Sequence, residues 1–171
     1  MSVAAVQVFK NKIVLGADSQ IATSDTCKKE FSEAKIWRGK DFMFASTGEC
    51  SEISLFTIYC NTKSPIGISS YDDKAVLYFF IGFIEFKKEL GAFSDKLDND
   101  YLFVFNKKAF LVGSDLYVKR VETYQAIGAG MAFAEAILWA GHSIKHAIKA
   151  ACQLSPFCDE PVVVYEYNID G

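Results

Sequence analysis

The chain opens with MSVAAVQVFKNKIVLGADSQ (residues 1–20), a stretch with the pattern of a buried β-hairpin. Two apolar runs, 2–9 and 12–18, flank Lys10 and Asn11, a polar pair that suits a two-residue turn. Neither VAAV nor IVL alternates apolar with polar residues, which is expected of strands that are covered on both faces. Cover by helices on one side and by a second sheet on the other predicts a layered domain.

Ser2 becomes a candidate nucleophile if the initiator methionine is removed. Its hydroxyl then shares one residue with a free α-amine, which titrates at about pH 8 and can accept the hydroxyl proton. Pairing through the turn sets Val3 opposite Asp18 and Ser2 opposite Ser19, so the Asp18 carboxylate lies beside the start of the chain. Both features also have ordinary explanations, because many proteins begin with Met-Ser and aspartate commonly starts a turn.

The rest of the chain reads as further strands and helices without a Pro/Gly/Ser-rich linker or a repeat, which predicts one domain over residues 1–171. The fold class is α+β, a four-layer αββα sandwich in which two antiparallel sheets lie between helical layers. A second hairpin is expected around residues 38–41, from strands 34–37 and 42–46. The later elements are expected as helices 51–61 and 71–90, strands 100–106, 109–114 and 117–123, helices 132–140 and 143–154, and strand 162–167.

Two residues of the second hairpin add to the candidate site. Lys35 interrupts an apolar stretch, and Gly48 ends the returning strand ahead of a helix. A strand lysine is usually an exposed edge charge and such a glycine is usually a turn. Together with Ser2 and Asp18, however, each has a chemical role, because Lys35 keeps the amine neutral, Asp18 holds Lys35, and the Gly48 amide donates to an oxyanion.

Composition excludes several other functions. A net charge of −3 without a basic stripe argues against nucleic acid or an anionic membrane as the partner. The longest apolar run, residues 75–84, is too short to span a bilayer, and the start of the chain lacks the pattern of a signal peptide. We therefore expect a cytoplasmic protein.

Metal and cofactor sites are not expected. The five cysteines show no CxxC or histidine-paired spacing, which argues against a disulfide framework and a zinc site. His142 and His146 lie four residues apart, as metal ligands on a helix can, but no acidic or cysteine partner is evident nearby. The sequence Gly128-Ala129-Gly130 lacks the GxGxxG pattern of a dinucleotide site.

Five segments carry a resemblance to a known family. These segments are IVLGADSQ (13–20), AKI (34–36), FASTG (44–48), AIGAG (126–130) and the stretch 156–165. In their order and spacing the chain resembles proteasome β-type, HslV-like subunits of the N-terminal nucleophile (Ntn) hydrolase superfamily, and within them small bacterial and phage-associated proteasome-like proteins.

The resemblance implies the αββα sandwich and peptide-bond hydrolysis in a ring of six or seven identical subunits, or a stacked pair of such rings. Ser2, Asp18, Lys35 and Gly48 stand at the positions of the nucleophile, carboxylate, lysine and oxyanion amide. Unfolded proteins or peptides are the implied substrates, no cofactor is implied, and the involvement of an ATP-driven unfoldase stays open.

The sequence also departs from the family pattern. Serine replaces the usual threonine nucleophile, and the supporting positions that differ are Ser19, Ala129, Ser155, Cys158 and Asp159. Because altered supporting residues commonly lower the rate of catalysis, two interpretations stay open: an N-terminal serine peptidase in a ring, or a structural subunit that is weakened or inactive. Amidase activity on a small substrate is a third.

An oligomer is also predicted from the helical aromatic residues. The run between Tyr78 and Phe86 is interpreted as helix core or as a subunit contact rather than as a ligand site. We expect a helical layer that exposes apolar side chains, which a closed ring would bury. Those side chains are Ile53, Phe56, Tyr59, Phe79, Phe80 and Phe83.

Overall fold

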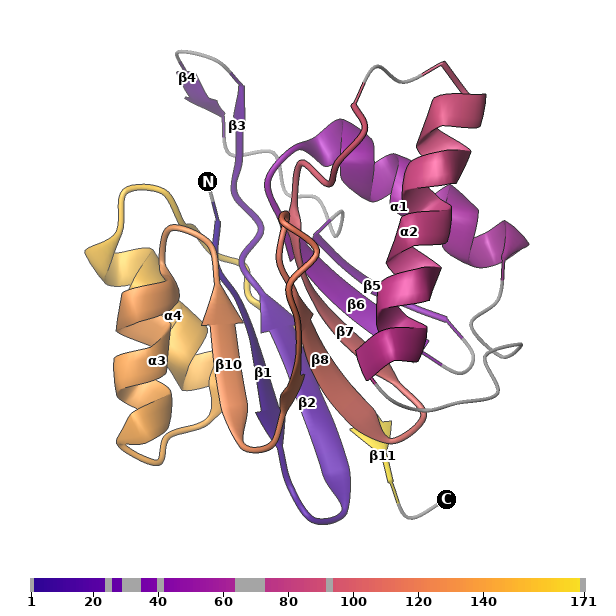
Figure 1. Cartoon of the computed structure of the whole chain (residues 1–171). Coiled ribbons are helices and arrows are strands. Elements are labelled where there is room, and N and C mark those ends of the chain that lie inside the picture. Colours follow the sequence, from indigo (N-terminus) through magenta and orange to yellow (C-terminus); the bar gives the residue numbers. More distant parts are fainter. Residues whose placement is uncertain are drawn as a thin grey trace.

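The structure is a computed structural model, and it describes residues 2–23, 26–28, 35–39, 42–63, 73–91 and 94–169. Two β-sheets face each other, and a pair of helices covers the outer face of each sheet (Figure 1). The elements are β1 (Ala4–Val8), β2 (Lys12–Ala17), β3 (Ile21–Thr23), β4 (Thr26–Lys28), β5 (Ile36–Arg38), β6 (Phe42–Thr47), α1 (Cys50–Thr62), α2 (Asp73–Glu89), β7 (Asp100–Phe105), β8 (Lys108–Val112), β9 (Val118–Val121), β10 (Tyr124–Ile127), α3 (Met131–Trp139), α4 (Ile144–Leu154) and β11 (Val163–Asn168).

Both main sheets are antiparallel. The first has the strand order β10-β1-β2-β11 and the second β5-β6-β7-β8-β9, while β3 and β4 form a separate ribbon. The register of β1 and β2 pairs Ala4 with Ala17, and the Asp18 amide donates to the Val3 carbonyl oxygen at 3.1 Å. The predicted hairpin register is therefore confirmed.

Three apolar cores separate the four layers. One lies between the sheets and is built from residues such as Leu15 and Leu102. A second lies between the first sheet and the α3–α4 layer, and a third lies between the second sheet and α1–α2. Each β-strand at the centre is thus covered on both faces, which explains its non-alternating apolar sequence. The predicted αββα sandwich is confirmed.

The expectation that the helical aromatic residues are exposed is wrong. Ile53, Phe56, Tyr59, Phe79, Phe80 and Phe83 are all buried. The Phe56 ring stacks on Phe80 with ring centroids 4.9 Å apart and meets Phe83 edge-on at the same distance. These side chains lie at helical spacing on the faces of α1 and α2 that pack onto the second sheet, so the folded subunit already buries them.

Three strands differ from the sequence-based expectation. Strand β10 was not expected, since its polar Tyr124 and Gln125 hide its apolar pattern, yet it pairs along β1. The short strands β3 and β4 were also not expected. The predicted positions of Ala34, Lys40 and Asp41, and of the first two residues of helix 71–90, lie outside the described residues.

Candidate active site

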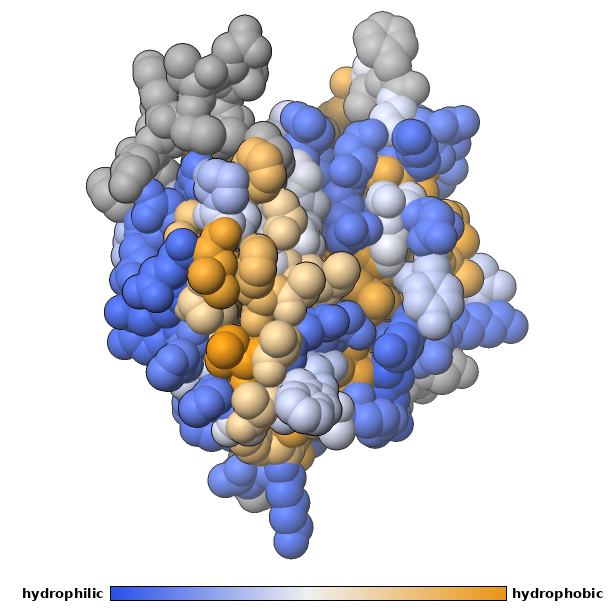
Figure 2. Space-filling view, turned by 90° about the vertical axis from the view of Figure 1, so that its left-hand side faces the viewer, coloured by the Kyte–Doolittle hydropathy of each residue, from blue (hydrophilic) through white to orange (hydrophobic). Residues whose placement is uncertain are grey.

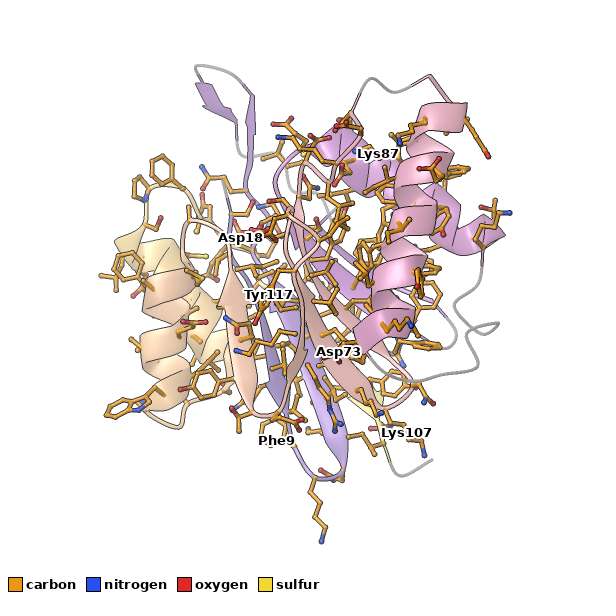
Figure 3. The ribbon with its side chains drawn as sticks, in the orientation of Figure 1. Phe9, Asp18, Asp73, Lys87, Lys107 and Tyr117 are labelled. Carbon is orange, nitrogen blue, oxygen red and sulfur yellow. The ribbon has the colours of Figure 1, made fainter. Side chains whose placement is uncertain are left out.

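A buried ion pair joins the two sheets. Asp18 directly follows β2 in the first sheet, and Lys35 directly precedes β5 in the second. The Lys35 Nζ atom lies 2.8 Å from Asp18 Oδ1, and the two residues are only 3% and 1% exposed. The Asp18 side chain lies at the end of the sheets where the chain begins (Figure 3). Lys35 is therefore not the usual exposed lysine of an edge strand. Burying two charges is costly unless both are well paired, and here each charge is the partner of the other.

Backbone amides complete the binding of the Asp18 carboxylate. Oδ1 also accepts from the Val3 amide at 2.9 Å, and Oδ2 accepts from the amides of Gln20 and Asp159, each at 3.2 Å. An ionised carboxylate accepts about four hydrogen bonds, and these donors together with Lys35 use that capacity. Asp18 is therefore an anchor that fixes both the start of β1 and the Lys35 ammonium group.

Ser2 lines a small pocket together with Lys35 and Gly48. The pocket has a volume of about 20 Å³ and is completed by Gln20, Ile21, Ser46, Cys50 and Ile53. The Ser2 backbone is held by the Gly130 amide, which donates to the Ser2 carbonyl oxygen at 3.2 Å. Three of the four predicted catalytic residues thus share one pocket, and the fourth, Asp18, is bonded to one of them.

Gly48 occupies a conformation that favours glycine. Its φ is +137°, and a Cβ at this position would overlap Asn99 Oδ1. Gly48 lies between the end of β6 and the start of α1, so its amide is placed by a strand on one side and a helix on the other. A rigid backbone donor of this kind suits the stabilisation of an oxyanion.

The predicted supporting residues fall into two groups. Ser19 and Asp159 belong to the Asp18 surroundings: the Ser19 amide donates to the Asp159 carbonyl oxygen at 3.1 Å, and the Ser19 hydroxyl donates to the Pro161 carbonyl oxygen at 2.6 Å. Ser155 caps the end of α4, and its Oγ accepts from the Phe157 amide at 3.3 Å. Ala129 is exposed and lies between the two glycines that contact Ser2.

Cys158 is buried near Asp18 but is not a competing nucleophile. Burial, followed by the nearby Asp18 carboxylate, raises the pKa of its thiol to about 11. Burial and the same carboxylate raise the pKa of the neighbouring Cys152 to about 12. Since the thiolate is the reactive form, both cysteines stay protonated at neutral pH.

Known structures decide which fold this is. The chain superposes on Thiobacillus denitrificans BPH with a TM-score of 0.87 over 98% of each chain, at 16% identity in a complex with epoxomicin and 15% in a second structure. It superposes on eukaryotic HslV from Trypanosoma brucei with a TM-score of 0.71, at 18% identity over 97% of this chain and 99% of that one. The chain has an HslV-like, proteasome-type fold. No protein-family model and no curated protein matches the sequence.

Two residues of this HslV-like chain were not predicted as site residues. Gly128 has φ +88°, and a Cβ there would overlap the Ser2 carbonyl oxygen, so a glycine allows the close approach of two backbones. The signal was the Gly-x-Gly between a strand and a helix. The second residue is Asn99, which contacts the Gly48 turn from a distant loop, and no sequence pattern indicates that contact.

Two further observations concern the described part of the HslV-like chain. The rings of His142 and His146 lie 5.0 Å apart on α4 and the turn before it, and no group of three His, Cys, Asp or Glu residues there is arranged to hold a metal ion. Its helices also include none with the length and apolar character needed to cross a membrane.

Proposed function

We propose that this chain is a proteasome-like peptidase subunit in which Ser2, once Met1 is removed, is an N-terminal nucleophile. The observation that carries the proposal is the shared pocket of Ser2, Lys35 and Gly48, with Lys35 fixed by the buried Asp18 carboxylate. A lysine is rarely this buried unless it is paired, and the Asp18 carboxylate that pairs with Lys35 holds it at the Ser2 pocket. The HslV-like fold supports the same conclusion.

The chemistry follows from these groups. Ser2 Oγ attacks the carbonyl carbon of a peptide bond while the Ser2 α-amine accepts the hydroxyl proton, directly or through one water. The Lys35 ammonium group favours the neutral amine before attack, and the Gly48 amide donates to the developing oxyanion. The C–N bond then breaks, the leaving amine takes the proton, and an acyl ester stays on Ser2. A water molecule hydrolyses the ester and restores the hydroxyl.

The substrates proposed are unfolded proteins or peptides. The pocket next to Ser2 is narrow, with a volume of about 20 Å³, so the bond to be cleaved must reach Ser2 in a confined space. An extended peptide segment meets this requirement more readily than a folded domain, because each of its side chains can be presented in turn.

We propose a ring of six or seven subunits, or two stacked rings, as the working assembly. Figure 2 faces the α3–α4 layer and shows an apolar stripe between hydrophilic margins. On α3, Met131 and Phe133 are about two-fifths exposed and Trp139 is 80% exposed. Apolar surface of this kind is typical of an interface between subunits. The buried thiols of Cys60 and Cys158 suit the reducing conditions of the cytoplasm.

A second candidate function is that of a structural subunit with weak or no catalysis. The observation that favours it is that two positions near the site lack the polar group of the family pattern. Ala129 has only a methyl group, and the Ser155 hydroxyl already accepts a hydrogen bond from the Phe157 amide. The Asp18–Lys35 pair argues against it, because that pair fixes the Lys35 ammonium group at the Ser2 pocket, where catalysis would use its charge.

Peptide hydrolysis by matched variants tests the proposal. Wild-type protein with a free Ser2 amine is expected to cleave short fluorogenic peptides, and Ser2→Ala is expected to remove that activity with an unchanged melting temperature. Ser51→Ala, a serine at the exposed start of α1, is the matched control and should cleave as wild type does. Cleavage that survives Ser2→Ala would contradict the mechanism, and assembly without any cleavage would favour the structural subunit.

A further inference from the structure

The turn that carries the Gly48 amide is held from behind by one buried side chain. Asn99, which lies in the loop before β7, is 1% exposed. Its Oδ1 accepts from the Glu49 amide, while its Nδ2 donates to Ser46 Oγ at 3.1 Å and to the Glu49 carbonyl oxygen at 3.0 Å. A single amide group therefore binds the chain on both sides of Gly48.

Asn99 is itself fixed by a buried carboxylate. Glu52, in the first turn of α1, accepts the Asn99 amide on Oε1 at 3.1 Å and the Asp98 amide on Oε2 at 2.9 Å. The Tyr101 hydroxyl donates to Oε1 at 2.8 Å. Lys87, in the last turn of α2, forms an ion pair with the same carboxylate. The loop that presents Asn99 is thus tied to both helices.

The ion pair keeps its charge in the core. Burial lowers the pKa of Lys87, but the hydrogen bonds and charges of Glu52 and Asp98 outweigh burial, and the pKa is raised overall. Lys87 Nζ also donates to the Lys96 carbonyl oxygen and to Asp98 Oδ2, each at 3.0 Å. Figure 3 shows Lys87 and Asp18 toward the same end of the molecule. A charged, fully bonded group is a rigid support because each bond fixes the others.

Stabilisation of an oxyanion depends on the exact aim of its donors, which must lie about 3 Å from the place where negative charge develops. The direction of the Gly48 amide is set by the peptide plane between Thr47 and Gly48, and Asn99 binds residues on both sides of that plane. A substitution of Asn99 would therefore change the direction of the Gly48 N–H, although Asn99 itself does not contact the substrate.

We propose that Asn99 is a positioning residue that aims the Gly48 amide at the reacting carbonyl group, with the Glu52–Lys87 pair as its anchor. The inference rests on the proposed function, since it assigns a role in that reaction. A purely structural role for the same network is the competing explanation, and the two differ in which kinetic constant responds.

Asn99→Ala and Tyr101→Phe form a matched pair of variants. Each removes hydrogen bonds of the same buried network, but only the Asn99 amide group bonds to Glu49, which directly follows Gly48, whereas the Tyr101 hydroxyl donates to Glu52. With a fluorogenic peptide, Asn99→Ala is expected to lower kcat about tenfold or more with KM within about twofold, since loss of a whole oxyanion donor costs roughly a hundredfold or more. Tyr101→Phe is expected to lower the melting temperature and to leave kcat within about twofold.

Hydrogen exchange measured by mass spectrometry gives a second readout that needs no activity. Asn99→Ala is expected to speed exchange of the Glu49 amide, which loses its acceptor, and Tyr101→Phe is expected to leave that amide as in the wild type. Wild-type kcat in Asn99→Ala, equal kcat losses in both variants, or unchanged exchange of the Glu49 amide would each overturn the inference. Faster exchange in Asn99→Ala, combined with a wild-type protein that cleaves nothing, would instead contradict the proposed function. If Asn99→Ala does not fold, Asn99→Asp takes its place, since it keeps the acceptor for the Glu49 amide and loses both donated hydrogen bonds. It is expected to show the same lowered kcat with a nearly unchanged KM.

Discussion

Lys35 Nζ donates to Asp18 Oδ1 at 2.8 Å across the space between two sheets, and both side chains are buried. Because Asp18 also accepts the amides of Val3, Gln20 and Asp159, one carboxylate connects the start of the chain, the lysine and the loop after α4. The same contacts that stabilise the fold therefore bring the Lys35 charge to the Ser2 pocket.

Replacement of Lys35 tests this connection. Lys35→Met keeps a similar side-chain length and removes the charge, so we expect peptide cleavage to fall about a hundredfold or more. Removing one partner of a buried pair costs about 3–5 kcal/mol, and the three remaining amide donors place the expected loss of stability at the lower end of that range. Urea denaturation and peptide hydrolysis measure the two effects. Cleavage near the wild-type rate would show that the lysine serves the fold alone.

Gly48→Ala is expected to impair both folding and cleavage. The added methyl group meets Asn99 and requires a φ of +137° from an L-residue, which costs more than about 1 kcal/mol. Gly141→Ala is the matched control, because Gly141 also has a positive φ, +86°, but its added Cβ would meet nothing within 4 Å. We expect the control to lose some stability and no activity. Equal loss of activity in both variants would contradict the role of Gly48.

The raised pKa values of the thiols predict alkaline instability. In the unfolded chain a cysteine has a pKa near 9, whereas the pKa values of Cys158 and Cys152 in the fold are about 11 and about 12. The folded protein favours the protonated thiols. Their contribution to the free energy of unfolding is therefore fully present below pH 9 and is lost as the pH rises toward 12. Urea denaturation at a series of pH values should show this fall, and Cys158→Ala should flatten it. An unchanged slope in that variant would contradict the assignment.

Assembly is expected to depend on the apolar stripe of α3. Light scattering after gel filtration should give a mass of six or seven subunits, or twice that, and Phe133→Glu should shift it toward a single subunit. Tyr78→Glu introduces the same charge at an exposed aromatic residue of α2 and should leave the assembly intact. A wild-type mass of one subunit, 19.0 kDa, at micromolar concentration would exclude the ring.

The sequence predicted those parts of the molecule that depend on local pattern. The β1–β2 register followed from the short polar turn, and it placed Asp18 beside Val3 correctly. The interpretation of the α2 aromatic residues as helix core is confirmed, but the exposure expected of Phe56 and Phe80 is wrong. Helical spacing shows that these two residues lie on apolar faces and does not show what covers those faces. Asn99 and Gly128 were missed, since their importance arises from contacts with distant residues, Gly48 and Ser2.

The most direct test of the account is the intact mass of the protein before and after incubation with epoxomicin, the compound present in one of the similar structures. Epoxomicin is a peptide epoxyketone, so a hydroxyl can add to its ketone and an amine can open its epoxide without a leaving group. We predict a chain that lacks Met1 and gains one full epoxomicin mass at Ser2, and a Ser2→Ala chain that gains none. An adduct that persists in Ser2→Ala, or a free Ser2 that forms no adduct and cleaves no peptide, would contradict the central claim.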